Sequence, residues 1–323
     1  MEVQAQNRGG QAGFAPRHSG HRIQACEGGV MRIVPALLLL LLVSPVGMAG
    51  GTLSERTYKR LAVIQALMGE ERYDEALERL APLAASVKRN HYEYAMVMQT
   101  YGYAYAARNR YREAISAFEQ SLATETLPDQ VQQAMRYDLA QLYAAIPDWQ
   151  AAARAYEQWL AGAEKPSAQS YAFGATIYAQ LKQYGKAIPK IKKAISLAPK
   201  PRESWYQLLL AMYYQRQNYS SSANVLQSMV AFWPDKAQYW KQLSGVYFTL
   251  EQNHKSLAVL ALAYRKGLLD SEHELMNLVN LYLLQNIPYK AATILEREMD
   301  AGRIEKSGKN LQKLGEAWMS ARE

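Results

Sequence analysis

This sequence has almost no cysteine, which excludes several kinds of chemistry. Its 323 residues include one cysteine, Cys26, so the rest of the chain has no disulfide, no thiol nucleophile and no cysteine metal ligand. After residue 49 only three histidines remain, His91, His254 and His273, and none has a second histidine at metal-ligand spacing. Glycine-rich phosphate loops and serine-nucleophile motifs are also missing. We expect no enzyme activity, no cofactor and no small-molecule substrate.

Phenylalanine and alternating β-branched runs are scarce as well. The chain has 5 Phe against 23 Tyr, and 49% of its residues are apolar, which is enough to build a core. Alanine and leucine are abundant and favour helix, while tyrosine packs its ring and keeps its hydroxyl in water. This composition predicts an all-α protein.

Long hydrophobic runs are limited to one, over residues 33–46. It is shorter than the about 20 apolar residues that a spanning helix needs. Arg32 precedes the run and small residues follow it up to Ala49, as in a secretory signal peptide. We therefore predict a signal peptide over residues 31–49, cleaved after Ala49. The alternative is an inner-membrane anchor formed by an uncleaved leader.

Residues 1–30 are polar and glycine-rich, and we expect a disordered extension there. A signal peptide normally starts at the first residue of a chain, and residues 1–30 do not resemble one. Met31 would be a suitable first residue for the leader, so we expect Met31 to be the biological start. No cysteine follows the leader, so a lipoprotein anchor is not expected. The predicted destination is the bacterial periplasm.

Acidic residues are fewer than basic ones, 29 against 37, and the formal net charge is +8. The densest basic stretch runs from Lys182 to Arg202. Such a stretch could meet nucleic acid or an anionic membrane. No interleaved aromatic pattern of the RNA-binding kind accompanies it. We interpret it as the solvated face of one helix and expect no nucleic-acid partner.

A motif of an aromatic residue, two variable residues and a small residue recurs along the chain. The clearest copies are Tyr73-Asp-Glu-Ala76, Tyr111-Arg-Glu-Ala114, Trp149-Gln-Ala-Ala152 and Tyr184-Gly-Lys-Ala187, and weaker copies begin at Tyr219, His254 and Tyr289. Each unit resembles the tetratricopeptide repeat, a helical hairpin of about 34 residues. The resemblance implies a right-handed α-solenoid of about seven hairpins over residues 50–307.

Numbering each repeat with its aromatic anchor at position 17 assigns the contacts inside a hairpin. Position 8, where the family has a small residue, holds Gly102, Ala140, Ala175 and Gly245, and position 20 is alanine in five units. Leu257 at position 20 and Asn280 at position 8 depart from the pattern, and Pro189 is expected to kink its helix. A bulky residue in place of Gly102 should overpack the hairpin. Residues 308–323 look like a further first helix, either a capping helix or a truncated eighth repeat.

The first helix of each hairpin is expected to line a concave groove. The groove residues that we single out are Gln99, Tyr103, Tyr137, Gln141, Gln207, Tyr214, Tyr239 and Gln242. Amides can bond to a peptide backbone while rings cover its side chains. The lysine, arginine and asparagine that clamp a peptide carboxylate in chaperone-binding relatives are missing at these positions. We expect a protein or an extended peptide segment as the partner, bound in the groove or, alternatively, on the convex face or loops.

The whole chain also resembles a proteobacterial family of periplasmic tetratricopeptide proteins described as components of TonB systems. The likeness is carried by residues 53–61, 171–178, 205–212 and 239–243. It implies a partner in the TonB–ExbB–ExbD machinery, which passes inner-membrane energy to outer-membrane receptors for iron chelates. The alternative is a scaffold for outer-membrane or peptidoglycan assembly.

Overall fold

The computed structural model describes residues 52–322, which form fifteen α-helices and no β-strand. These described residues fall into two units, an N-terminal unit of residues 52–197 and a C-terminal unit of residues 198–322. The N-terminal unit contains α1 (Glu55–Gly69), α2 (Tyr73–Val87), α3 (His91–Ala107), α4 (Tyr111–Leu122), α5 (Asp129–Ala145), α6 (Trp149–Gly162), α7 (Ala168–Gln180) and α8 (Tyr184–Leu197). The C-terminal unit contains α9 (Glu203–Gln215), α10 (Tyr219–Phe232), α11 (Ala237–Thr249), α12 (Asn253–Arg265), α13 (Glu272–Leu284), α14 (Pro288–Asp300) and α15 (Gly308–Ser320).

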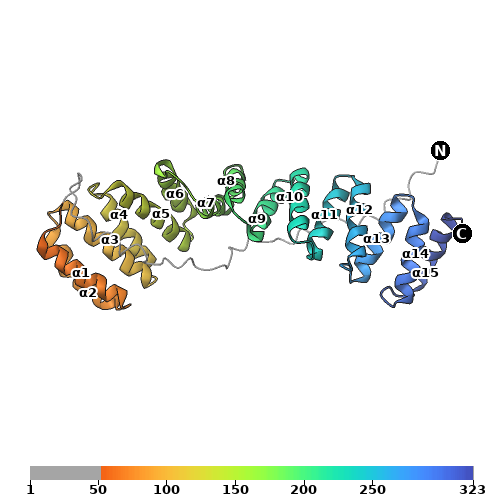
Figure 1. The fold of residues 1–323 in the computed structure, drawn as a ribbon, viewed down its shortest axis with the longest axis horizontal. Helices are drawn as coiled ribbons and strands as arrows, with labels where there is room; N and C mark the ends of the chain where they lie inside the picture. Colours follow the sequence, from red (N-terminus) through yellow and green to blue (C-terminus); the bar gives the residue numbers. More distant parts are fainter. Residues whose placement is uncertain (1–51, 323) are drawn as a thin grey trace. The chain divides into compact units, whose positions relative to one another are not determined.

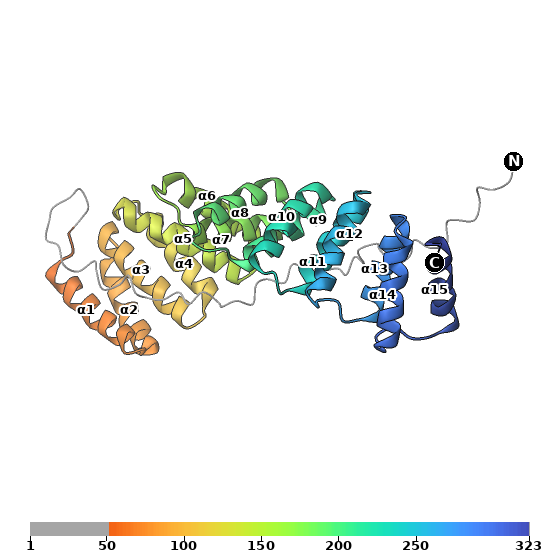
Figure 2. The ribbon, with the colours of Figure 1, turned by 45° about the vertical axis from the view of Figure 1, so that its right-hand side comes forward.

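Within each unit the helices follow one another as antiparallel hairpins (Figures 1 and 2). We call the two helices of a hairpin helix A and helix B, so that α3 and α4, for example, are helix A and helix B of the second repeat. The predicted all-α repeat fold is confirmed. The expected extension and signal peptide lie outside the described residues. Within the described part of the chain, no helix is both long enough and apolar enough to cross a membrane.

The turn from helix A to helix B has a constant backbone. One residue, two positions before helix B, takes a left-handed conformation that ends helix A. The non-proline residues in this role are Glu71, Asn109, Lys182, Gln217, Glu251 and Asn286, with φ between 53° and 60°. The next residue donates its backbone N–H to a carbonyl in the last turn of helix A, as Asn218 does to Tyr213 at 2.9 Å.

This turn shows that helix B of repeats six and seven begins one residue earlier than the sequence pattern predicts. The left-handed residues Glu251 and Asn286 place position 17 at Asn253 and Pro288. The prediction had used the nearest aromatic or ring-bearing residues, His254 and Tyr289. It was wrong in both repeats. His254 is exposed rather than packed, and Tyr289 is 52% exposed.

The corrected register places buried residues at the two positions that had departed from the repeat pattern. Position 20 becomes Ser256 in repeat six, which is completely buried, instead of Leu257. Position 8 of repeat seven becomes Val279, which is also completely buried, instead of Asn280. The physical requirement is a residue that fits between two close helices, and an aromatic anchor is only an indirect sign of it.

Close approach of the helices is clearest at Gly102 in repeat two. A Cβ atom added there would lie 2.3 Å from the ring of Phe118, which is 1% exposed. Gly245 was predicted to have the same role, but a Cβ atom there would have no neighbour within 4 Å. In that repeat the contact is made by Ser244, whose hydroxyl lies 2.9 Å from that of Ser256.

Tyrosine hydroxyls on helix A join neighbouring repeats. Tyr178 donates to Glu157 on the preceding helix B at 2.6 Å, and Tyr143 donates to Glu119 in the same way. In the C-terminal unit Tyr247 accepts from Gln227 at 2.5 Å. All three tyrosines occupy position 11 in the corrected register, so the stacking of repeats includes a recurring polar contact besides apolar burial.

The helices continue through their internal prolines. Pro189 lies inside α8, and Pro82, which the sequence pattern did not flag, lies inside α2. The lysines of α8 are exposed, apart from the half-buried Lys190. At the other end, α15 has the helix A pattern, with Ala317 buried and Leu311 49% exposed.

Candidate protein-binding sites

In the N-terminal unit one of the predicted groove residues, Tyr103, binds a carboxylate. Gln99 is only 7% exposed, whereas Tyr103, Tyr137 and Gln141 are half-buried. The hydroxyl of Tyr103, on α3, donates to Oδ2 of Asp138, on α5, at 3.1 Å. The structure therefore brings Tyr103 against Asp138, the residue after Tyr137, which the sequence analysis did not single out.

Asp138 is a half-buried carboxylate with one hydrogen-bond partner. No ion pair to it occurs among residues 52–322, and Tyr103 is its only hydrogen-bond donor there. Burial raises the pKa of Asp138 to about 6, and the Tyr103 hydrogen bond opposes this only in part. Burial, and then the Asp138 charge, also raises the pKa of Tyr137 to about 12.

Aromatic rings support this site from the neighbouring helices. The Tyr137 ring centroid lies 4.6 Å from that of Trp159 on α6 and 5.7 Å from that of Phe173 on α7. Phe118 packs edge-on against Tyr103 with centroids 5.0 Å apart. Edge and tilted contacts of this kind fix ring orientation. Tyr103 and Tyr137 are therefore held in place on the helix A face.

In the C-terminal unit, two predicted groove residues belong to an inter-repeat network. Gln207, which is exposed, donates to the hydroxyl of Tyr239 at 2.9 Å. Tyr239 in turn donates to Glu203, and Lys236 pairs with the same carboxylate at 2.5 Å. Tyr239 is 2% exposed, so its ring presents almost no surface to a partner. In the corrected register it occupies position 3, which is also buried in the preceding repeat as Trp205.

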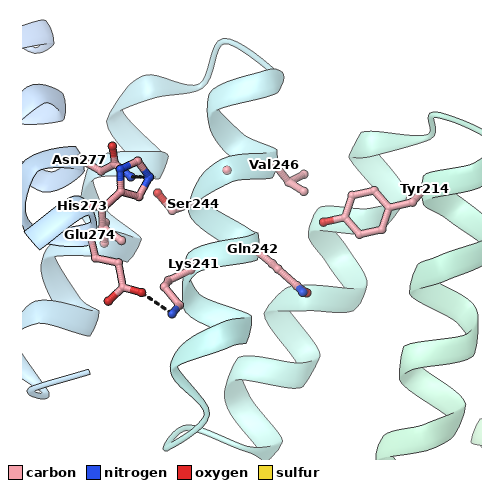
Figure 3. Close-up of a pocket in the computed structure, with 10 residues that line it drawn as sticks. Tyr214, Lys241, Gln242, Ser244, Val246, His273, Glu274 and Asn277 are labelled. Carbon is pink, nitrogen blue, oxygen red and sulfur yellow. Dashed lines mark hydrogen bonds and ion pairs between the residues drawn. The ribbon is translucent and has the colours of Figure 1, made fainter. Parts of the chain in front are cut away.

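The other two, Tyr214 and Gln242, line a pocket of about 300 Å³. The pocket lies between α9, α11 and α13, and Leu260 of α12 contributes to its lining. Figure 3 shows Tyr214 opposite Gln242 and Val246, with polar side chains of α13 at the other side. The remaining lining residues are Lys241, Ser244, Gly245, His273, Glu274 and Asn277.

The charges of this pocket neutralise each other. Lys241 pairs with Glu274 at 2.5 Å (Figure 3). Burial acts to raise the pKa of Glu274, but the hydrogen bonds from Lys241 and from the backbone N–H groups of Asp270 and Ser271 lower it overall. Glu274 thus caps α13 and links two repeats. On the pocket rim, the side-chain amide of Asn277 and the imidazole of His273 hydrogen-bond to each other, with Nδ2 and Nε2 3.1 Å apart (Figure 3).

Sequence reasoning missed Asp138 and Lys241 for different reasons. Asp138 lies at position 6, next to Tyr137, and only positions 2, 5, 9 and 12 had been assigned to the groove. Lys241 moves to position 5 once repeat six is counted from Asn253. A charged residue beside a groove position was the available signal in both cases. Among the described residues, no group of three or more acidic, histidine or cysteine side chains could hold a metal ion.

A family model for the tetratricopeptide repeat matches residues 102–131, from α3 to the start of α5. No curated protein is significantly similar in sequence to the chain. The match covers one repeat, and the other hairpins share its turn and its packing.

Solved structures share the fold at low sequence identity. The Naa15/Naa10 complex bound to HypK-THB aligns with a TM-score of 0.57 and 14% identity, over 82% of this chain but only 39% of that one. A tetratricopeptide repeat protein from Parabacteroides merdae gives a TM-score of 0.45 at 14% identity, over 82% of this chain and 99% of that one. YrrB, a tetratricopeptide repeat protein with an unusual peptide-binding site, gives 0.43 at 15% identity, over 56% and 90%. The likeness shows the fold alone.

Proposed function

We propose that this chain is a non-enzymatic scaffold that binds an extended segment of another protein along its helix A faces. The observation that carries the proposal is the pocket between α9, α11 and α13. Its lining combines an apolar part, Val246 and Leu260, with amide groups on Gln242 and Asn277. Such a surface can bond to peptide backbone while covering an apolar side chain.

We further propose that the scaffold works in the periplasm with the TonB–ExbB–ExbD system. The support is the whole-chain resemblance together with the leader-like segment of residues 31–49. In this proposal the leader is removed after Ala49. Amino-terminal sequencing of the protein purified from its native cell tests the export step, and an intact leader would contradict it.

Site-specific photocrosslinking tests the partner and the binding face together. A photoreactive amino acid replaces Gln242, which is exposed on the pocket rim, and in a matched variant it replaces Ala258, which is exposed on α12 and does not line the pocket. We expect a component of the TonB system to be captured from position 242 and not from position 258.

The other outcomes are equally informative. Capture of peptidoglycan or outer-membrane assembly proteins at position 242 would replace the TonB assignment with the assembly scaffold. Equal capture from both positions would move binding away from the pocket. A Tyr214→Ala variant should weaken the crosslink at position 242, since Tyr214 forms the opposite wall (Figure 3).

A further inference from the structure

Among residues 52–322 the carboxylate of Asp138 has no cation, unlike several other carboxylates at the junctions between repeats. In the C-terminal unit Glu203 pairs with Lys236, Glu274 with Lys241, and the buried Glu298 with Arg303. Desolvated carboxylates are costly unless a cation or several donors compensate them. In the part of the chain that the structure describes, Asp138 has the Tyr103 hydroxyl alone. Its environment is therefore arranged for a charge that the described part of the chain does not supply.

The same unit shows what such a site looks like when it is filled. Glu157 accepts a hydrogen bond from the hydroxyl of Tyr178 at 2.6 Å, as Asp138 does from Tyr103. There, however, Lys190 completes the group. Its Nζ lies 3.1 Å from Glu157 and 5.2 and 5.3 Å from the ring centroids of Tyr156 and Tyr178. A tyrosine-bonded carboxylate with tyrosine rings beside it thus holds an ammonium group within this fold.

The difference in charge compensation shifts the pKa values of the two carboxyl groups, Asp138 and Glu157, in opposite directions. Burial acts to raise both pKa values. At Glu157 the donors Tyr178 and Lys190 outweigh burial, and the pKa is lowered. At Asp138 no cation opposes burial, and the pKa is raised.

We propose that Asp138, with Tyr103 and Tyr137, receives a lysine or arginine side chain of the bound peptide. This inference rests on the proposed peptide-binding function and specifies the chemistry of one contact. The incoming cation would pair with the carboxylate and lie against the Tyr137 ring, an arrangement that ion pairing and cation–π attraction both favour. Tyr103 fixes the carboxylate by its hydrogen bond.

The test measures the binding of fluorescent octapeptides to the full chain at low ionic strength by fluorescence anisotropy. We expect octalysine to bind and octaglutamate not to bind, although the formal net charge of +8 works against this order. Asp138→Asn should weaken octalysine binding by about tenfold or more. Asp129→Asn is the matched control, because Asp129 is exposed on the same helix and the charge change is the same.

Three results would overturn the proposal. They are failure of octalysine to bind, equal binding by the wild type and Asp138→Asn, and tighter binding of octaglutamate. Free spermidine is tested as a further ligand. If spermidine binds as tightly as octalysine, the site would be assigned to a free amine instead. Thermal unfolding of each variant confirms that it is folded. The crosslink at position 242 lies in the other unit, so the inference can fail while the proposed function stands.

Discussion

At the residue scale, Gly102 and Gly245 differ in the space around them, although the sequence pattern gave both the same role. Gly102 faces the buried ring of Phe118, whereas Gly245 faces no atom within contact distance. We predict that Gly102→Ala destabilises the protein by about 1–3 kcal/mol, because a new methyl group must displace a packed ring. Gly245→Ala should stabilise it by up to about 1 kcal/mol through helix propensity. Urea denaturation measures both, and equal effects would contradict the assigned contacts.

Asp138 should be a residue that lowers stability at neutral pH. Its pKa rises from 3.8 to about 6 on folding, so the folded state binds the proton more tightly than the unfolded chain does. Stability contributed by the protonated form is present below about pH 4 and is lost as pH rises through about 6. We expect Asp138→Asn to be more stable than the wild type at pH 7 by about 1–3 kcal/mol.

The pH dependence shows whether the stability difference comes from the titration of Asp138 or from the substitution itself. Asparagine does not titrate, so the stability difference between Asp138→Asn and the wild type should disappear near pH 4. Urea midpoints at pH 4, 5, 6 and 7 give the profile. A difference that stays constant across this range would show that the carboxylate is well solvated in the folded protein. A stabilising substitution at a binding residue would fit the common conflict between stability and function.

At the element scale, the first five helix B segments begin where the aromatic motif predicts. Tyr73, Tyr111, Trp149, Tyr184 and Tyr219 are each the first residue of their helix. The last two could not be placed in the same way, because Asn253 and Pro288 are not aromatic and a ring follows each of them. The signal that was available is the small residue needed where helix A and helix B meet. This residue is Ser256 in repeat six and Ala291 in repeat seven, and both are completely buried.

This register leads to a paired prediction on α12. Ser256 is completely buried against Ser244, so Ser256→Leu should cost about 1–3 kcal/mol or more by overpacking. His254 is exposed, and His254→Ala should change the free energy of unfolding by less than about 0.5 kcal/mol. If the order were reversed, as the aromatic pattern implied, the corrected register would be wrong.

The site could be predicted only in part for a related reason. A four-position rule finds Tyr103, Tyr137 and Tyr214, which lie on the helix A faces. It cannot show that Tyr239 is buried or that Asp138 lacks a cation, because both depend on what the adjacent helices place around them.

At the scale of the whole molecule, each repeat packs mainly on its neighbours in the chain within its own unit. Stability in such arrays is a sum over repeats and junctions, so a local defect spreads only a short way. We predict that Gly102→Ala speeds amide hydrogen exchange in α3, α4 and the adjoining helices, and leaves α11 to α14 unchanged. Hydrogen exchange followed by mass spectrometry tests this. Uniform acceleration along residues 52–322 would indicate one cooperative unit instead.

The tyrosine contacts between repeats also restrict how the array can be rearranged. Tyr143 and Tyr178 each need an acceptor on the preceding helix B, whereas Tyr247 meets the amide of Gln227 there. A hairpin transplanted behind a different neighbour would keep its junction only if that neighbour carried a matching group. Duplication or deletion of repeats, in evolution or by design, should therefore succeed most readily when the cut falls inside a hairpin and each tyrosine travels with its partner.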